Sequence, residues 1–181
     1  MPESSSSRIK GHGVEAATSL MRLSLRTAQI GKCGELLVQY RLLLLGIEAA
    51  PLSTDAGIDL VAYAPGSAQS VTIQVKTNLR AKPGGGKGKA ALDWWIPENS
   101  PAECVALVDL ASESVWLMTH TELLAHAQQR SGGKLHLYMY IDRSVRRRNL
   151  ERISLREEFD EFLLSERAIS VFNLAPRTPA P

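Results

Sequence analysis

Three polar side chains in two neighbouring segments of the chain could do chemistry together. Asp59 lies in one apolar segment, 57–63, and Gln74 and Lys76 lie in the next, 71–77. If the two segments are strands of one hairpin, Gln74 and Lys76 are two residues apart and project from the same face. A carboxylate, an amide oxygen and an ammonium on one patch of sheet suit chemistry that needs a divalent cation beside a phosphate. The leading hypothesis from these residues is therefore phosphodiester hydrolysis.

The elements that would position these residues follow from the apolar pattern. Apolar residues recur at near-helical spacing over 27–45, and Gly46 stands where a C-terminal helix cap is expected. The hairpin strands are expected at about 57–64 and 70–77, and Pro65-Gly66-Ser67 supplies a turn between them. This arrangement places a helix directly before the hairpin.

The rest of the chain is expected to alternate between strands and helices. Residues 104–110 are almost continuously apolar, which predicts a strand covered on both faces. Segment 81–90 has four glycines and three lysines and is expected to be a flexible loop. Other expected elements are an edge strand at 47–52, strands at 115–118 and 135–141, a helix at 119–129 capped by Thr119 or Thr121, and a final helix from the capping box Ser154–Glu157 to about Leu164. Helices and strands around one mixed sheet indicate an α/β fold.

Size and composition are those of a soluble protein with a single domain. Of the 181 residues, 16–174 are expected to fold together, between disordered tails at 1–15 and 175–181. Cys33 and Cys104 show no metal-ligand spacing, which predicts two free thiols in a reducing cytosol. Neither a signal peptide nor an apolar run of bilayer length is evident, so we expect a cytoplasmic protein with no membrane partner.

Basic residues are the main candidates for contact with a phosphate backbone. The net charge of +2 does not by itself diagnose a nucleic-acid-binding protein, but basic residues gather at 80–89 and 143–152. Arg146-Arg147-Arg148 would hold phosphates only if it lies on the active face. The residues that we expect to bind nucleic acid are Arg80, Lys82, Lys87 and Lys89.

Several other residues could take part in a site but have simpler explanations. Asp55 is a rival metal ligand that more simply forms a turn. Trp94 and Trp95 are adjacent in a predicted strand and must point to opposite faces, so packing is favoured over base stacking. Three histidines share no spacing and are given no catalytic role: His120, His126 and His136.

Taken in order, the motifs resemble those of the PD-(D/E)xK nuclease superfamily, which includes Holliday-junction resolvases and many restriction enzymes. The residues that carry the resemblance are Gly34-Glu35 in the first helix, Gly57-Ile58-Asp59, and Gln74-Val75-Lys76, within about residues 27–118. The resemblance implies a restriction-endonuclease-like mixed β-sheet flanked by helices. Gln74 occupies the position usually held by Asp or Glu, which makes this a Gln-x-Lys variant.

The resemblance also implies a mechanism, which is metal-dependent hydrolysis of double-stranded or branched DNA. Mg²⁺, for which Mn²⁺ should substitute, would be held by Asp59, the Gln74 amide oxygen and the Val75 carbonyl, with Glu35 bound directly or through water. Lys76 would orient the attacking water or counter the developing negative charge. A homodimer would allow two strands to be cut.

Two other classes of function stay open. The chain could be a nuclease-fold DNA-binding module without catalysis, which the uncharged Gln74 favours, or a protein-interaction scaffold on the same fold. Metal binding separates an enzyme from both alternatives, and a salt-dependent DNA-binding titration separates the two alternatives from each other.

Overall fold

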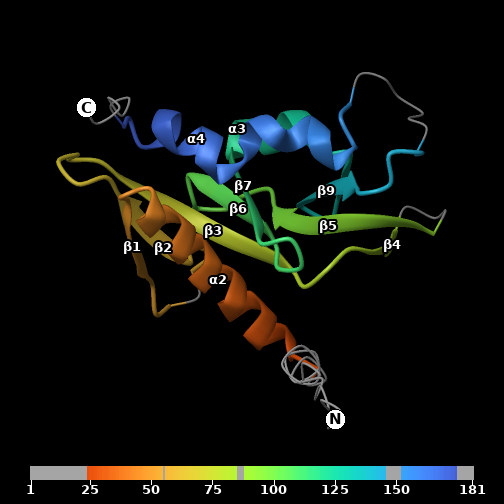
Figure 1. Ribbon diagram of the computed structural model, residues 1–181, viewed down its shortest axis with the longest axis horizontal. Helices are drawn as coiled ribbons and strands as arrows, with labels where there is room; N and C mark the ends of the chain where they lie inside the picture. Colours follow the sequence, from red (N-terminus) through yellow and green to blue (C-terminus); the bar gives the residue numbers. More distant parts are fainter. Residues whose placement is uncertain (1–23, 55, 85–87, 146–151, 175–181) are drawn as a thin grey trace, which may run out of the picture.

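The computed structural model describes residues 24–54, 56–84, 88–145 and 152–174 (Figure 1). Its elements are α2 (Thr27–Leu44), β1 (Glu48–Pro51), β2 (Leu60–Tyr63), β3 (Ser70–Asn78), β4 (Lys82–Gly84), β5 (Lys89–Pro97), β6 (Cys104–Asp109), β7 (Ser114–Thr119), α3 (His120–His126), β8 (Gln129–Ser131), β9 (Lys134–Tyr140), the 3-10 helix η2 (Arg156–Phe162) and α4 (Leu164–Val171). Several predictions fall outside the described residues: the two tails, Asp55, Lys87 and Arg146–Arg148.

The strands form two sheets, which corrects the prediction of one. The first sheet has the order β1-β2-β3-β6-β7 and is mixed, because β3 and β6 run parallel while its other pairs are antiparallel. The second sheet, β4-β5-β9-β8, is antiparallel throughout. The side-chain amide of Asn78 in β3 donates to the Asp93 carbonyl in β5 at 2.7 Å, where the two sheets meet. The predicted mixed sheet flanked by helices is confirmed.

Strand β6 separates two hydrophobic clusters, one on each side of the first sheet. All six of its residues are buried. Cys104, Ala106 and Val108 pack in the cluster that includes residues of α2 and α4, and Val105 and Leu107 pack in the cluster beneath the second sheet. This alternation is what a strand covered on both faces requires. The prediction made for 104–110 is confirmed.

Local signals placed the first helix and the hairpin turn correctly. Gly46 has a φ of +79°, and the N–H groups of Gly46 and Ile47 donate to the carbonyls of Leu43 and Leu42 at the end of α2. This pattern of two hydrogen bonds closes a helix end that only glycine adopts readily. The hairpin turn has Gly66 at a φ of +87°, so glycine is needed there for the same reason.

Two predictions about the later part of the chain are wrong. The segment predicted as the loop 81–90 contributes strand β4 and the first residues of β5, with Lys82 opposite Ala91. Pro83 is tolerated because β4 is an edge strand, where a missing N–H leaves no ladder partner unpaired. The helix predicted to run to Gln129 ends at His126, although Thr119 caps it as expected.

The start of the final helical segment is also corrected. The Ser154 carbonyl accepts a hydrogen bond from the Tyr140 N–H at 2.7 Å, which keeps this part of the chain extended beside β9. The helix therefore begins later, as the 3-10 helix η2, and α4 follows it. The carboxylate of Glu158, rather than that of Glu157, accepts from the N–H groups of Ser154 and Leu155.

None of the helices in the described ranges is long and apolar enough to cross a membrane.

The two cysteines should differ sharply in reactivity. Burial in β6, reinforced by the Glu103 and Glu122 carboxylates, raises the pKa of the Cys104 thiol to about 12, whereas Cys33 is partly exposed. Since the thiolate is the reactive form, iodoacetamide at neutral pH should alkylate Cys33 and spare Cys104, as measured by peptide mass spectrometry. Modification of Cys104 in the folded protein would contradict the structure.

The same shift in pKa sets how stability depends on alkaline pH. An unfolded chain ionises this thiol near its ordinary pKa of 9.0, and the folded chain does so only near about 12. The stabilising contribution is therefore complete below pH 9 and is lost as the pH rises from 9 to 12, by about 1.4 kcal/mol per pH unit. Urea unfolding measures this effect. Between pH 9 and 12, the free energy of unfolding should fall less steeply with pH in Cys104→Val than in the wild type.

Candidate active site

The hairpin brings the Asp59 carboxylate beside strand β3. The Asp59 N–H donates to the Ile73 carbonyl at 2.9 Å, one residue before β2 begins at Leu60. The Asp59 carboxylate then accepts a hydrogen bond from the Val75 N–H at 2.6 Å. It therefore lies level with Val75, the residue between Gln74 and Lys76. One oxygen of the carboxylate accepts this hydrogen bond. Asp59 therefore also satisfies the Val75 N–H, which the hydrogen bonds between the strands leave without an acceptor.

Gln74 is held in place by the loop that follows β5. Its side chain is 5% exposed, and its amide oxygen accepts a hydrogen bond from the Ser100 hydroxyl at 3.2 Å. Gly57 has a φ of +81°, and a Cβ there would lie 3.1 Å from Pro101 Cδ and 3.6 Å from the Gln74 amide nitrogen. Ser100 and Pro101 thus belong to the surroundings of the site, and no short motif in the sequence pointed to them.

Lys76 lies two residues along β3 from Gln74 and so shares its face. Its side chain is partly buried. Its ammonium makes no hydrogen bond or ion pair with any residue in the described ranges. An unpaired cation beside a carboxylate-bearing hairpin is available to a phosphate or a bound water.

The structure does not bring Glu35 to the other three residues. Its carboxylate pairs with Lys32, one turn earlier on α2, at 2.7 Å. A side chain at the preceding residue, Gly34, would overlap Thr77, so α2 packs on the Thr77 face of β3. Gln74 and Lys76 project from the opposite face, because they are an odd number of residues from Thr77.

The donor atoms at this place fit a hard cation. Carboxylate, amide and carbonyl oxygens are the ligands that Mg²⁺ and Mn²⁺ take in proteins. Among the described residues there is no group of three or more His, Cys, Asp or Glu side chains placed to hold a metal. Asp59 is thus the one carboxylate that the described hairpin offers, and the low charge predicts weak metal binding.

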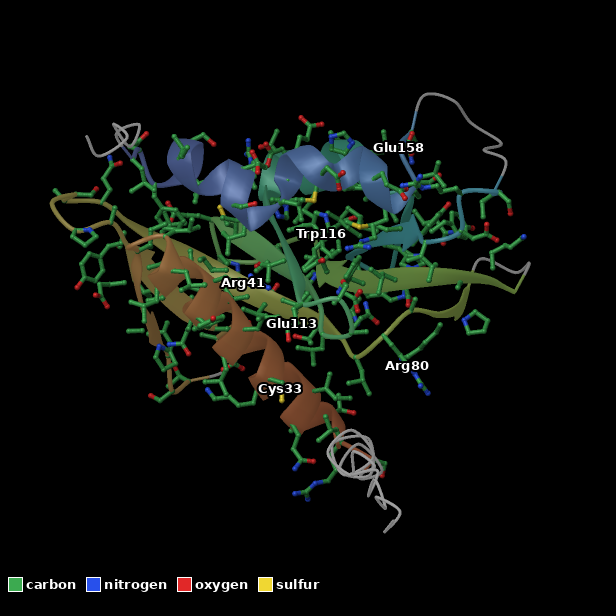
Figure 2. All side chains as sticks on the ribbon, viewed as in Figure 1. Cys33, Arg41, Arg80, Glu113, Trp116 and Glu158 are labelled. Atoms are coloured by element: carbon green, nitrogen blue, oxygen red, sulfur yellow. The ribbon has the colours of Figure 1, made fainter. Side chains whose placement is uncertain are left out.

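The predicted DNA-binding residues differ in how free their charges are. Arg80 and Lys82 are exposed, and Figure 2 shows the Arg80 side chain projecting away from the fold between β3 and β4. Lys89 instead pairs with Asp142 at 3.2 Å. Hydrogen bonds from Ser144, and then from Lys89, lower the pKa of Asp142 to about 2, so the pair stays ionised at neutral pH. The Lys89 charge is therefore already partly neutralised.

The adjacent tryptophans point to opposite faces of β5, as predicted. Trp94 is 3% exposed and meets Trp116 edge-on, with ring centroids 6.1 Å apart. Trp95 is 42% exposed and stacks on His136 across the strand pair, with centroids 4.2 Å apart and an angle of 3° between the rings. The packing explanation holds for Trp94, and Trp95 lies on the outer face of the second sheet.

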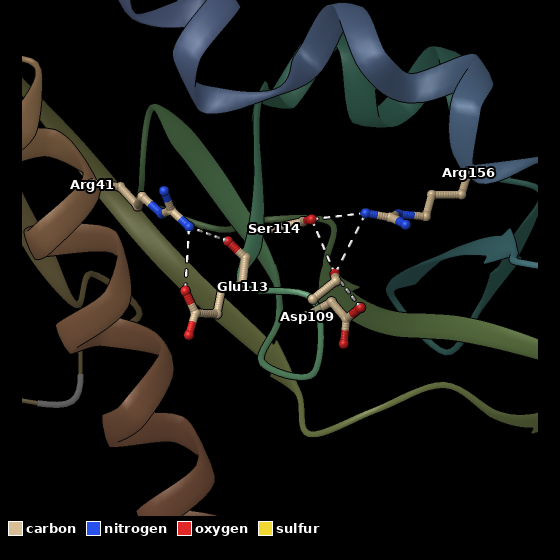
Figure 3. A network of polar contacts seen from close by, with 6 residues as sticks. Arg41, Asp109, Glu113, Ser114 and Arg156 are labelled. Atoms are coloured by element: carbon tan, nitrogen blue, oxygen red, sulfur yellow. Dashed lines mark hydrogen bonds and ion pairs between the residues drawn. The ribbon is translucent and has the colours of Figure 1, made fainter.

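A second polar cluster fastens the helices to the β6–β7 turn and lies elsewhere (Figure 3). Arg41 of α2 donates to the Glu113 carbonyl at 3.1 Å, and Arg156 of η2 donates to the Ser114 hydroxyl at 2.8 Å. A cavity of about 290 Å³ opens beside Arg41 and Glu113. None of the hairpin residues considered above lines this cavity, and we assign the cluster a structural role.

Comparisons with known proteins found similar folds among solved structures. No family model matches the sequence, and no curated protein matches it. The structure is similar to that of the bacterial homing endonuclease I-Ssp6803I, with a TM-score of 0.53 and 14% sequence identity over 83% of this chain and 94% of that chain. It also matches Hjc, a Holliday junction resolvase from Archaeoglobus fulgidus, with a TM-score of 0.41 and 15% identity over 59% of this chain and 82% of that chain. This second likeness is too weak to establish a shared fold by itself. The similarity to I-Ssp6803I shows the fold alone, which is restriction-endonuclease-like, as the sequence predicted.

Proposed function

We propose that this protein is a metal-dependent nuclease that hydrolyses phosphodiester bonds in DNA. The observation that carries the proposal is that the Asp59 carboxylate lies level with Val75, the residue between Gln74 and Lys76. The Lys76 ammonium has no partner among the described residues. The fold, which is that of an endonuclease, supports the proposal without establishing the activity.

Each residue of the site has a distinct task in the proposed reaction. Asp59, the Gln74 amide oxygen and the Val75 carbonyl would hold Mg²⁺ or Mn²⁺. Glu35, which pairs with Lys32, is left out of this ligand set. The metal, when bound, would acidify a water and stabilise negative charge on the scissile phosphate. Lys76 would orient that water and counter the charge that develops on the phosphate oxygens. Ser100 would keep the Gln74 oxygen oriented through its hydrogen bond.

The exposed cations beside the second sheet would bind the DNA backbone. Arg80 and Lys82 have open charges, and the paired Lys89 would contribute less. Phosphate contacts of this kind position a duplex without reading its sequence.

Asp59→Asn tests the metal site without removing the hydrogen-bond acceptor for the Val75 N–H. The asparagine oxygen can still accept that hydrogen bond, so the free energy of unfolding should change little. Lost charge at a metal ligand should lower Mg²⁺-dependent cleavage of plasmid DNA by at least about 10²-fold. Asp59→Ala is the matched variant, because it also loses the acceptor and should cost a further ~1–3 kcal/mol of stability. Full cleavage by folded Asp59→Asn would remove Asp59 from the site.

The second candidate function is a DNA-binding module without catalysis. What favours it is that no group of three or more His, Cys, Asp or Glu side chains among the described residues is placed to hold a metal. Calorimetric titration with Mn²⁺ separates the two candidates, because the module would bind DNA in the absence of metal and show no metal-binding heat. Binding of Mn²⁺ that Asp59→Asn abolishes would favour the enzyme.

A further inference from the structure

Helix α2 is apolar on two opposite faces, although only one of them packs against the sheet. Gly34, Val38 and Leu42 form the buried face. On the other side, four large side chains are each more than half exposed, at 54%, 54%, 59% and 56%: Leu36, Tyr40, Leu43 and Leu44. A contiguous apolar patch on a protein surface often marks a place where another molecule binds. Figure 1 shows α2 along the outside of the five-stranded sheet.

The spacing of the exposed residues is that of a helix-pairing seam. Leu36, Tyr40 and Leu43 are separated by four and then three residues, and Cys33 precedes them by three. This alternation of three and four residues is the seam along which two helices interlock side chains. The charged neighbours leave the seam itself uncharged, because Lys32 pairs with Glu35 and Arg41 turns toward Glu113.

We infer that the outer face of α2, formed by Leu36, Tyr40, Leu43 and Leu44, is an interface between two copies of this chain. The patch is complementary to itself, because a two-fold axis sets the same three-four pattern against its own copy. Leucine side chains without neighbouring free cations would not suit a phosphate backbone. This inference does not depend on the proposed nuclease activity.

The size of the patch sets the expected affinity. Half of each of four large side chains amounts to roughly 400 Å² per copy, so the pair would bury about 800 Å² from these residues. That area lies at the low end of specific interfaces, where complexes are weak and reversible. We therefore expect a monomer–dimer equilibrium with a dissociation constant in roughly the micromolar range.

Sedimentation velocity of the full chain over a series of protein concentrations tests the inference. The wild type should move from the mass of one chain toward that of two, and Leu36→Glu and Leu43→Glu should each raise the dissociation constant at least about tenfold. Ile169→Glu is the matched control, because Ile169 is 53% exposed but lies on α4. It should dimerise like the wild type. Circular dichroism and thermal unfolding check that each variant is folded.

Cys33 provides a second readout in the unmodified protein. It lies on the seam, three residues before Leu36, and is the cysteine that we expect to be alkylated, because it is partly exposed whereas Cys104 is buried. Its alkylation rate should fall as the wild-type concentration rises, and Leu36→Glu should remove that dependence. A wild type that stays monomeric at every concentration would overturn the inference. This holds even if Cys33 resists alkylation, because the outer face of α2 would then be covered by the same chain and not by a second copy. A dimer that survives both glutamate variants, or that Ile169→Glu breaks equally, would also overturn it.

Discussion

Lys76→Met should lower Mg²⁺-dependent DNA cleavage by about 10²–10³-fold while the chain stays folded. Methionine keeps an unbranched apolar side chain, which preserves the packing of the partly buried lysine stem. It removes the ammonium, which has no partner among the described residues, so folding loses no described ion pair. The loss should therefore appear in the rate of cleavage rather than in stability.

The measurement is single-turnover cleavage of linear, supercoiled and branched DNA with saturating Mg²⁺ or Mn²⁺. Lys134→Met is the matched control, because it makes the same change in charge at an exposed position on β9. It should leave the rate nearly unchanged. Glu35→Gln should have a smaller effect than Lys76→Met, because the Glu35 carboxylate pairs with Lys32 and its helix packs on the other face of β3. Equal rates for Lys76→Met and the wild type would exclude Lys76 from the chemistry.

Gln74→Glu should make the stability of the protein depend on bound metal and should raise the affinity of the site for Mg²⁺. A new carboxylate at a position that is 5% exposed, next to Asp59, is costly without a cation. We expect a loss of about 1–3 kcal/mol in the free energy of unfolding in EDTA. Bound Mg²⁺ would offset that loss, because the added charge provides a further ligand. The Mg²⁺ concentration for half-maximal cleavage should fall by at least about tenfold.

Thermal unfolding and cleavage over a Mg²⁺ series measure both effects. Gln69→Glu is the matched control, because Gln69 is exposed near the tip of the same hairpin and receives the same change in charge. It should show no metal-dependent stabilisation. If wild type and Gln74→Glu are both inactive and neither binds Mn²⁺, the DNA-binding module replaces the enzyme as the proposed function.

Local patterns in the sequence were enough to predict the parts of the fold that depend on neighbouring residues. The first helix, its glycine end at Gly46 and the turn at Gly66 follow from helical spacing and from backbone angles that glycine adopts. The doubly covered strand β6 and the opposite directions of Trp94 and Trp95 follow from the two-residue period of a strand. The shared face of Gln74 and Lys76 follows from the same period.

Contacts between distant segments decided the other features of the fold and the site. A local sequence pattern cannot predict such contacts. The Asn78–Asp93 contact lies where the strands divide into two sheets, and the Ser154–Tyr140 hydrogen bond delays the final helix. Ser100, which lies 26 residues from Gln74 in the sequence, donates a hydrogen bond to the Gln74 amide oxygen. Glu35 matches the family motif in residue type and in its place along the chain. In the structure α2 packs on the Thr77 face of β3, and the Glu35 carboxylate pairs with Lys32. The sequence by itself thus determined which residues could form the site. Only the packing of helix, loop and sheet decided which of them meet, because the distance between side chains depends on that packing and not on spacing along the chain.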